Sequence, residues 1–364
     1  MTFPNALRGA TEIKSLAAEI EGCITGPLNI MEVCGGHTHG IRRFGLNQLM
    51  PRGVRFSHGP GCPVCVMPKE RIDQAIALAR QDDVILVTFG DMMGVPGSAG
   101  SLTRARADGC DVRMVYSPMD SVKIAGENPE KKVVYFAIGF ETTAPLTAAV
   151  IERVKGEGLD NVFFHINHVL VAPAMDAIMD ARDVRVDAFI APGHVSTITG
   201  WAIYREMAER YGTPIVVSGF EPVDILQSVL MIARQIAEGR SEAENQYVRA
   251  VTESGNRKAR ALMDRYFEVR PVFRWRGLGD IPESGLRLKQ EFAGLDAESV
   301  FHDLLPWEPV DDHKLCICGE VLRGKARPTD CQGFGKACTP KSPVGACMVS
   351  SEGACHAYFS YQEI

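Results

Sequence analysis

Eight short runs of apolar residues recur in the first 220 residues of this chain, and each has the length of a buried strand. Most are separated by segments in which apolar residues follow a helical period. Near-continuous apolar strands that alternate with helices are typical of parallel sheets covered by helices on both faces. The predicted strands are 28–33, 54–57, 84–89, 112–116, 133–138, 162–166, 188–191 and 215–218.

The polar stretch 126–132 separates the first four predicted strands from the last four. We therefore expect an α/β protein with two lobes, 1–127 and 128–220, each with a small parallel sheet covered by helices, and a cleft between them. After Gly219 the pattern changes to two helical segments, followed by glycine and proline breaks and a cysteine-rich tail. This change predicts a third, helical and loop-rich domain over 221–364.

Charge and hydropathy narrow the classes of function. The net charge is −6 and no block of lysine and arginine occurs, which argues against a nucleic-acid partner. No apolar run reaches the roughly 18 residues that a membrane span needs. The first residues also lack the basic and then apolar form of a signal peptide. The expectation is a cytoplasmic protein, in which clustered cysteines indicate metal or redox chemistry.

Polar residues follow nearly every predicted strand. Ligands of open parallel sheets bind at the carboxyl ends of the strands, and unpaired buried polar groups cost free energy. Their recurrence at this position predicts one shared site between the lobes. The segments begin at Glu32, His58, Phe89, Gly139, His165, Pro192 and Gly219.

Cys34 is the first candidate for chemistry. Gly35 and Gly36 follow it, and a helix is expected to begin at about His37. A helix N-terminus favours a thiolate, which is both a nucleophile and a metal ligand. His37 and His39 lie within reach of the same turn, although a histidine near a turn is often only a hydrogen-bonded polar side chain.

Cys62 and Cys65 have the spacing of a thioredoxin-like redox pair, and a helix is expected over 68–79. The other interpretation is half of a zinc site, but no second pair with this spacing completes one. We therefore favour the interpretation that the two cysteines form a dithiol that can close into a disulfide. Cys23 and Cys110 have no ligand-like neighbours and are interpreted as ordinary thiols.

Six of the eleven cysteines fall in the tail, among turn-forming residues. Their long and uneven spacing from Cys331 onward favours an iron–sulfur cluster over a zinc ion or structural disulfides, although no spacing rule decides between them. The six are Cys316, Cys318, Cys331, Cys338, Cys347 and Cys355. Together with the dithiol, such a cluster suggests electron delivery to chemistry at Cys34.

The chain resembles the HypD family of hydrogenase maturation factors. The resemblance rests on long runs of residues spread over 31–355, nearly the whole chain. The matching segments are 31–39 (MEVCGGHTH), 59–65 (GPGCPVC), 89–93 (FGDMM), 139–145 (GFETTAP), 167–170 (NHVL), 192–197 (PGHVST), 219–226 (GFEPVDIL) and 347–355 (CMVSSEGAC).

The resemblance implies a scaffold on which the Fe(CN)2CO unit of [NiFe] hydrogenases is assembled. It implies that Cys34 holds the iron together with a cysteine of the chaperone HypC, and that Cys62 and Cys65 are the redox pair. It also implies a [4Fe-4S] cluster, whose expected ligands are Cys331, Cys338, Cys347 and Cys355, with Cys316 and Cys318 competing for the same positions. Cyanide would come from HypE, and the finished unit would pass to the precursor of the hydrogenase large subunit.

Two other functions remain open at this stage. A stand-alone thiol–disulfide reductase fed by the cluster needs only Cys62, Cys65 and the tail, and leaves the segment from Cys34 to His37 unexplained. A structural protein with a zinc-binding tail leaves both N-terminal sites unexplained. Whether the protein is itself an enzyme is not decided by the sequence.

Overall fold

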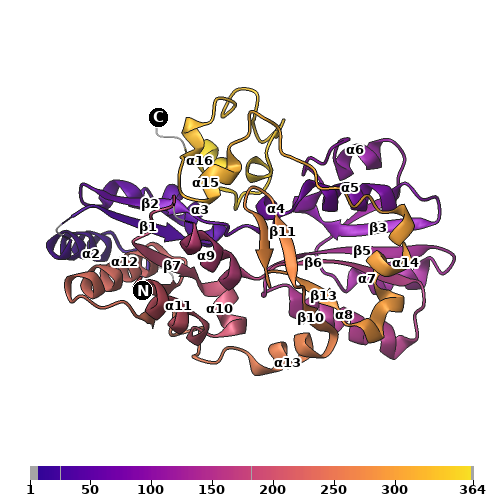
Figure 1. Ribbon diagram of the computed structural model, residues 1–364, viewed down its shortest axis with the longest axis horizontal. Coiled ribbons are helices and arrows are strands. Elements are labelled where there is room, and N and C mark those ends of the chain that lie inside the picture. Colours follow the sequence, from indigo (N-terminus) through magenta and orange to yellow (C-terminus); the bar gives the residue numbers. More distant parts are fainter. Residues whose placement is uncertain (1–6, 25, 182, 362–364) are drawn as a thin grey trace.

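The fold consists of two α/β lobes and a cysteine-rich tail that packs across them (Figure 1). It was obtained as a computed structural model that describes residues 7–24, 26–181 and 183–361. The fold class predicted from the apolar pattern is confirmed: parallel sheets covered by helices form both lobes.

The first lobe is built on a parallel sheet in the order β2-β1-β7-β8-β9. One face is covered by α2 and α12, whose apolar side chains pack on β1, β7 and β8. The strands are β1 (Leu28–Glu32), β2 (Val54–His58), β7 (Ala188–Pro192), β8 (Ile215–Ser218) and β9 (Ala243–Asn245). The helices and turns of this lobe are α2 (Ala10–Cys23), α3 (Gly35–Arg43), η1 (Leu46–Leu49), α9 (Val171–Asp180), α10 (Gly193–Thr199), η3 (Ala202–Tyr204), α11 (Arg205–Tyr211) and α12 (Pro222–Ala237).

The second lobe is built on a parallel sheet in the order β4-β3-β5-β6. Its two faces are apolar, as expected for central strands buried on both sides. The strands are β3 (Val84–Phe89), β4 (Val112–Val115), β5 (Lys132–Gly139) and β6 (Val162–His168). The helices between and around them are α4 (Pro63–Val66), α5 (Lys69–Ala79), η2 (Gly90–Met92), α6 (Leu102–Ala107), α7 (Asp120–Glu127) and α8 (Ala144–Glu157).

The predicted grouping of the strands was wrong. β1 and β2 share a sheet with β7 and β8, whereas β3 to β6 form the other sheet. The expected boundary at 127/128 therefore falls inside the second lobe, between β4 and β5. The polar stretch there is only the connection from α7 to β5, and the chain crosses between the lobes after β2 and again after β6.

The expected third domain, 221–364, is not a separate unit over that range. The predicted long helix is present as α12, but α12 and β9 complete the first lobe. The following segment packs largely on the second lobe, where α13 contacts α8 and β13 contacts β6. It contains α13 (Arg257–Tyr266), β10 (Phe267–Val269), β11 (Val272–Trp275), β12 (Gly279–Pro282), β13 (Leu286–Leu288), η4 (Gln290–Leu295), α14 (Ala297–Val300) and η5 (His302–Leu304).

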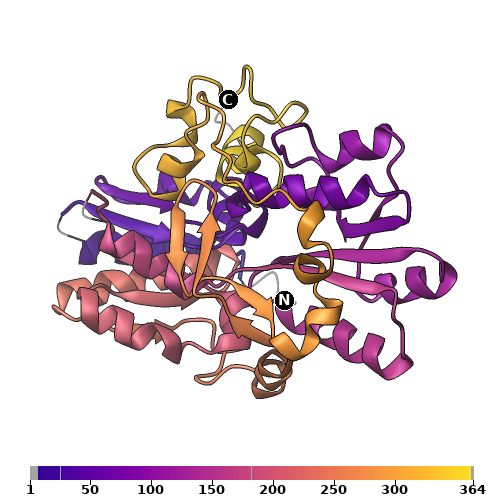
Figure 2. The same ribbon diagram turned by 45° about the vertical axis from the view of Figure 1, so that its right-hand side comes forward.

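The cysteine-rich tail is the part that agrees with the expected loop-rich domain. It contains only short helices and turns: α15 (Cys318–Leu322), η6 (Pro328–Asp330), η7 (Ala346–Met348) and α16 (Ala354–Ser360). Figures 1 and 2 show it lying over the junction of the two lobes. Its contacts reach both, because α16 packs on α3 and η7 packs on α4. Among the described residues, no helix is long and apolar enough to cross a membrane.

Candidate functional site: a cysteine turn, a dithiol and a cysteine-lined pocket

Cys34 lies where β1 ends and α3 begins, with extended backbone at the N-cap position. The carbonyl of Gly61 accepts a hydrogen bond of 2.9 Å from the Gly35 N–H, so the loop after β2 lies directly against this turn. A Cβ at Gly61 would stand 2.3 Å from the backbone nitrogen of Cys34. Only glycine allows the two backbones to approach this closely, and the contact brings Cys34 near the segment that carries Cys62.

The buried carboxylate of Glu32 holds the turn from the inside. It accepts hydrogen bonds from the Cys34 N–H at 3.0 Å, from the Thr38 hydroxyl and from His58 Nδ1 at 2.6 Å. His58 Nε2 is in turn 3.1 Å from the hydroxyl of Tyr358 in the tail. A buried carboxylate with this many donors is satisfied, and the chain of contacts ties the turn to both β2 and α16.

The thiol of Cys34 is less acidic than a helix start alone would make it. Burial raises its pKa above the usual range, and the carboxylates of Glu352 and Glu32 add to this effect. The backbone N–H groups of Gly36 and His37 act in the opposite direction but do not prevail. The sequence-based expectation of a thiolate-prone Cys34 is therefore wrong for the metal-free protein. Nearby carboxylates that disfavour a thiolate favour a bound cation.

His37 is fully buried and neutral. Its Nε2 lies 3.0 Å from the carbonyl oxygen of Gly219, which can only accept, so Nε2 carries the proton and donates it. Burial lowers its pKa to about 4. Nδ1 has no hydrogen-bond partner among the described residues, so its lone pair is free to accept a hydrogen bond or bind a metal. The His37 ring stacks on the ring of Phe220 with centroids 4.7 Å apart, and the His194 ring also stacks on Phe220, at 3.9 Å.

His39 is directed toward the tail. Its Nε2 lies 3.1 Å from the Tyr361 hydroxyl and the two rings meet edge to face. This contact gives His39 a role in holding α3 against the tail.

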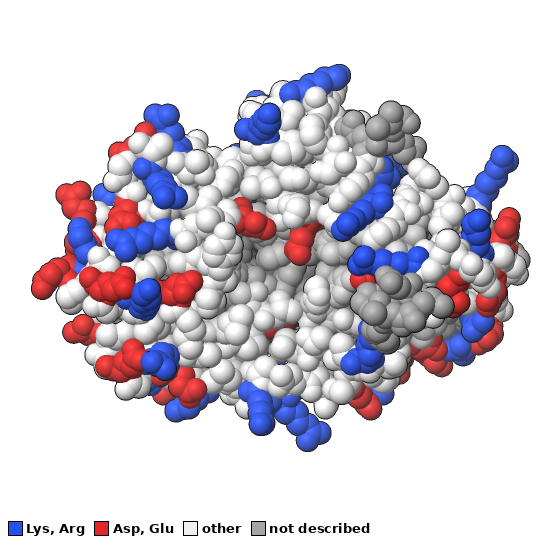
Figure 3. Space-filling model, turned by 180° about the vertical axis from the view of Figure 1, so that it is seen from behind, with Lys and Arg blue, Asp and Glu red and all other residues white. Residues whose placement is uncertain are grey.

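Groups from both lobes and the tail approach Cys34. The backbone of Glu352 packs on Gly35, and Ser350 Oγ donates a hydrogen bond of 3.1 Å to Asp91, which follows β3. Glu141, which follows β5, is buried with one carboxylate oxygen unpartnered. Figure 3 shows that the surface between the lobes, seen from behind, is hollowed and nearly free of lysine and arginine. Asp91 is thereby joined to the tail segment that packs on the turn, whereas Glu141 accepts a hydrogen bond of 3.0 Å from the Val171 N–H at the start of α9.

The strand end at β6 does not take part. His165 is hydrogen-bonded to Gln74 at 2.9 Å, and Asn167 accepts from the Arg71 guanidinium inside the second lobe. His168 is buried with Nε2 at 2.8 Å from the Thr147 hydroxyl. His165 and Asn167 are held by hydrogen bonds in the core, whereas Nδ1 of His168 has no hydrogen-bond partner among the described residues.

Cys62 and Cys65 lie at the start of α4, and both are almost fully buried. The Cys62 sulfur accepts a hydrogen bond of 3.3 Å from the Cys65 N–H, as an N-cap residue does. Burial raises the pKa of the Cys65 thiol, and its neighbours Cys347 and Cys62 raise it further. Cys65 thus favours the protonated thiol, both cysteines are shielded from solvent, and Cys347 of the tail is a sulfur neighbour of Cys65.

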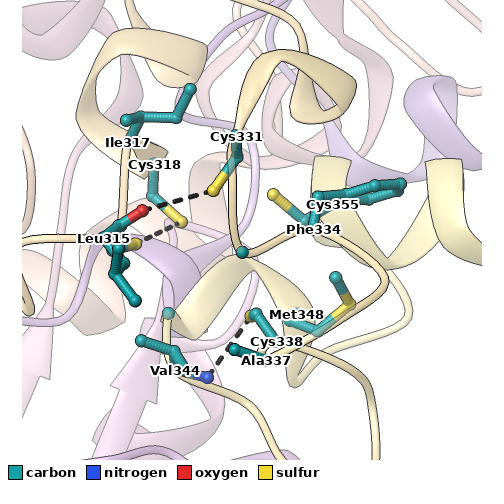
Figure 4. A pocket seen from close by; sticks show the side chains of 13 residues that line it. Leu315, Ile317, Cys318, Cys331, Phe334, Ala337, Cys338, Val344, Met348 and Cys355 are labelled. Atoms are coloured by element: carbon teal, nitrogen blue, oxygen red, sulfur yellow. Dashed lines mark hydrogen bonds between the residues drawn. The ribbon is translucent and has the colours of Figure 1, made fainter.

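Five tail cysteines line one pocket with apolar residues between them. Figure 4 shows the sulfurs of Cys318, Cys331, Cys338 and Cys355 turned toward a common space. The lining cysteines are Cys316, Cys318, Cys331, Cys338 and Cys355. A Cβ at Gly345 would stand 2.5 Å from the sulfur of Cys316, so glycine is needed there for the thiols to converge. Within the described part of the chain, no three histidine, cysteine or acidic side chains converge closely enough for a single metal ion.

Cys347, one of the four expected cluster ligands, does not line this pocket. It is fully buried and lies between the pocket and the dithiol. Hydrogen bonds from Cys318, Cys355 and Cys65 lower its pKa well below the usual range. A continuous series of thiols thus leads from Cys65 through Cys347 to the pocket.

The sequence analysis did not single out Glu352, Ser350 or the contact between Cys65 and Cys347. Glu352 and Ser350 lie in the segment 347–355 that supported the family resemblance, but nothing local assigns them to Cys34. Their partners are about 260 to 320 residues away in the sequence, so only the tertiary fold brings them together.

The fold and this arrangement of thiols define an α/β protein whose cysteines gather at two strand ends and in the tail. The sequence matches the family model HypD, described as the hydrogenase formation hypA family, over residues 10–362. The chain therefore belongs to the HypD family, as its motifs indicated.

Curated relatives cover nearly the whole chain. Hydrogenase maturation factor HypD2 of Bradyrhizobium diazoefficiens is 52% identical over 342 residues, covering 92% of this chain and 90% of the relative. HypD of Cupriavidus necator is 50% identical over 340 residues, covering 92% and 89%. HypD of Escherichia coli K12 is 46% identical over 351 residues, covering 96% and 94%. These relatives are named as hydrogenase maturation factors.

Proposed function

We propose that this protein is a scaffold and redox factor for assembling the Fe(CN)2CO unit of [NiFe] hydrogenase. Cys34 holds the iron together with a cysteine of the chaperone HypC, HypE supplies cyanide, and the finished unit passes through HypC to the large-subunit precursor. Membership of the HypD family supports the maturation role. The cysteine turn supports the assignment of the iron to Cys34.

The observation that carries the proposal is the position of the dithiol. Cys62 follows Gly61, whose backbone lies against Cys34, and Cys65 contacts Cys347 in the tail. One short segment therefore joins the candidate iron site to the thiols of the tail. Oxidation of the Cys62–Cys65 dithiol to a disulfide releases two electrons and two protons beside Cys34.

The iron is the cargo of this site. Around it, Glu352 and Glu32 contribute negative charge that favours a bound cation. His37 is held by the Gly219 carbonyl, with its Nδ1 lone pair available. We propose that His37 acts through Nδ1 as a ligand or hydrogen-bond acceptor. The neutral ring has no second proton to donate, so the proton-donor alternative is not favoured.

The pocket fits a [4Fe-4S] cluster in its donor set, because several cysteine sulfurs face one apolar space. Bound there, such a cluster would exchange electrons one at a time with the Cys62–Cys65 dithiol/disulfide couple. We propose Cys316, Cys331, Cys338 and Cys355 as its ligands. This set replaces Cys347 by Cys316, since Cys347 lies outside the pocket. Cys318, whose sulfur is 3.2 Å from that of Cys316, competes with Cys316 for one ligand position.

The experiment is infrared spectroscopy of the anaerobically purified protein, co-expressed with the other maturation proteins. We expect bands of iron-bound cyanide and carbon monoxide in the wild type and their loss in Cys34→Ala. Cys110→Ala is the matched control, because Cys110 is outside the site, and it should keep the bands. A Cys34→Ala protein that keeps them would overturn the assignment.

The alternative function is a stand-alone thiol–disulfide reductase. It is supported by the same contact between Cys65 and Cys347. It requires no iron at Cys34. Loss of the bands in Cys34→Ala together with loss of hydrogenase maturation would exclude it. An unchanged level of maturation in Cys34→Ala, with maturation lost in Cys62→Ser, would favour it.

A further inference from the structure

A second polar hollow lies beside the cysteine turn, where the tail packs on the edge of the first lobe. Its lining comes from α3, the segment after it, β2, η6 and α16, and α16 packs on α3 (Figure 1). An adjoining smaller hollow shares part of this lining and extends along β2 to the segment after α15. Both N-terminal and tail residues are therefore needed to form it.

The charged groups of the larger hollow are all cationic. Arg42, Arg55 and Arg327 line it, and no carboxylate does. Among the described residues, neither Arg55 nor Arg327 has an ion-pair partner within 4 Å. In the smaller hollow, Asp330 is the one acidic group, and its carboxylate accepts a hydrogen bond of 2.8 Å from the Arg327 backbone N–H.

Two buried donors in these hollows lack a partner. The Nε of Arg42 is buried with no hydrogen-bond acceptor among the described residues, although its guanidinium stacks over Tyr358 at 4.1 Å. The hydroxyl of Ser57 is likewise unpartnered, and Ser57 is only 8% exposed. Unpaired buried polar groups are costly, so these atoms point to a ligand that supplies acceptor oxygens.

We propose that this arginine hollow binds a phosphate-type oxyanion, either free or as the phosphate group of a small molecule. Three guanidinium groups offer forked donors that match phosphate oxygens. Neutral donors from Asn47 and Thr329 complete the lining. The apolar surfaces of Phe56, Val54 and Ile41 beside them would hold a non-polar part of a larger ligand.

The hollow is connected to the proposed iron site by side chains that contact both. Arg42 is in the last turn of α3, the helix whose N-cap is Cys34. His58, also in the lining, is hydrogen-bonded to Glu32, which holds the Cys34 backbone. A ligand here therefore contacts groups that fix the cysteine turn.

Calorimetric titration of the full-length protein with inorganic phosphate and with pyrophosphate, under anaerobic conditions, tests the proposal. We expect saturable binding of at least one anion. Arg55→Gln and Arg327→Gln should each weaken it about tenfold or more, because a charge-assisted hydrogen bond contributes roughly 1.5–3 kcal/mol. Arg52→Gln is the matched control, since Arg52 is exposed three residues before Arg55 and is outside the lining.

Tighter binding of pyrophosphate than of phosphate would support a ligand with more than one phosphate group, and equal or stronger binding of phosphate would support the free ion. The absence of saturation by either anion would overturn the proposal. Equal weakening in Arg52→Gln and Arg55→Gln would also overturn it, because the effect would then be general surface charge. Because Arg55 is an exposed residue of an edge strand, its variant is expected to fold even if Arg327→Gln does not.

Discussion

Cys347 differs from the other tail cysteines in where its sulfur lies. It contacts Cys65, Cys318 and Cys355, whereas the sulfur of Cys316 faces the pocket. We expect Cys316→Ala, Cys331→Ala, Cys338→Ala and Cys355→Ala each to lower bound iron sharply, because each removes a proposed ligand. Cys347→Ala should retain most of the iron. The measurement is iron content and visible absorbance of anaerobically purified protein.

Cys23→Ala serves as the control for that series, since Cys23 ends α2 away from the tail. Full iron content in Cys316→Ala together with its loss in Cys347→Ala would restore the ligand set that the spacing of the cysteines first indicated. Loss of iron in Cys23→Ala would mean that the content reports general folding.

Glu141 makes the stability of the protein depend on pH. Burial raises the pKa of its carboxyl to about 7, from 4.5 as the ordinary value. The unfolded chain therefore ionises at a lower pH than the folded one. Its contribution to stability is fully present below pH 4.5 and is lost as the pH rises through 7, by about 3 kcal/mol. Glu141→Gln should remove this loss.

The check is the free energy of unfolding, measured by denaturant titration at pH 5 and pH 8 for both proteins. The difference between the two pH values should be smaller in Glu141→Gln, and other titrating groups cancel in the comparison. Glu130→Gln, at an exposed glutamate before β5, should behave like the wild type. An identical pH dependence in wild type and Glu141→Gln would show that the carboxyl is ionised in the folded protein.

At the residue level, the identities of Cys34, Cys62 and Cys65 as candidates could be predicted because each stands in a local motif at a strand end. The pKa of the Cys34 thiol could not be predicted from the sequence. It depends on Glu352, which is more than 300 residues away in the sequence and close in space. Cys347 was assigned from the spacing of the cysteines and the family resemblance, and neither reports which way a sulfur points.

At the level of elements, the start of α3 depends on a backbone contact with the loop after β2. A Cβ at Gly61 would collide with the Cys34 backbone at 2.3 Å, where neither side can move like a flexible side chain. We expect Gly61→Ala to destabilise the protein by roughly 2–4 kcal/mol. It should also change the rate at which Cys34 is alkylated. Denaturant titration and mass spectrometry of alkylated peptides measure the two effects.

Gly126→Ala is the matched control for this substitution. A Cβ there meets nothing within 4 Å, and the residue is exposed in α7. Alanine favours a helix by up to about 1 kcal/mol over glycine, so the control should be neutral or slightly stabilising. Equal behaviour of the two variants would mean that the loop and the turn are not in contact.

The eight strands predicted in the first 220 residues have ends within about two residues of those in the structure, because buried parallel strands are continuous apolar runs. The short strands β9 to β13 that follow were not predicted. The pairing of the eight strands was not predicted either. The local pattern of apolar residues does not show which strands lie side by side. The composition of the chain also does not show the two places where it crosses between the lobes. The same holds for α12, whose amphipathic pattern predicts a helix but not its packing on α2.

At the level of the whole molecule, the tail connects parts that the chain places far apart. Its contacts reach α3 and α4, and Tyr358 and Ser350 bond to residues of different lobes. The tail has only short helices, and its backbone hydrogen bonds are those of single turns. Regions of this kind open before the core does. On the proposed cluster assignment, the metal supplies much of the stability of the tail.

We therefore expect iron removal by chelation to loosen the tail first. Amide hydrogen exchange should rise over residues 316–361 while β5 and β6, which are buried in the second lobe, stay protected. Loss of the Glu352 contact should expose Cys34 and lower the pKa of its thiol, so Cys34 should be alkylated faster, and Cys110 should not. Equal loss of protection in the tail and the central strands would mean that the molecule unfolds as one unit. Unchanged exchange in the tail would mean that iron does not hold it.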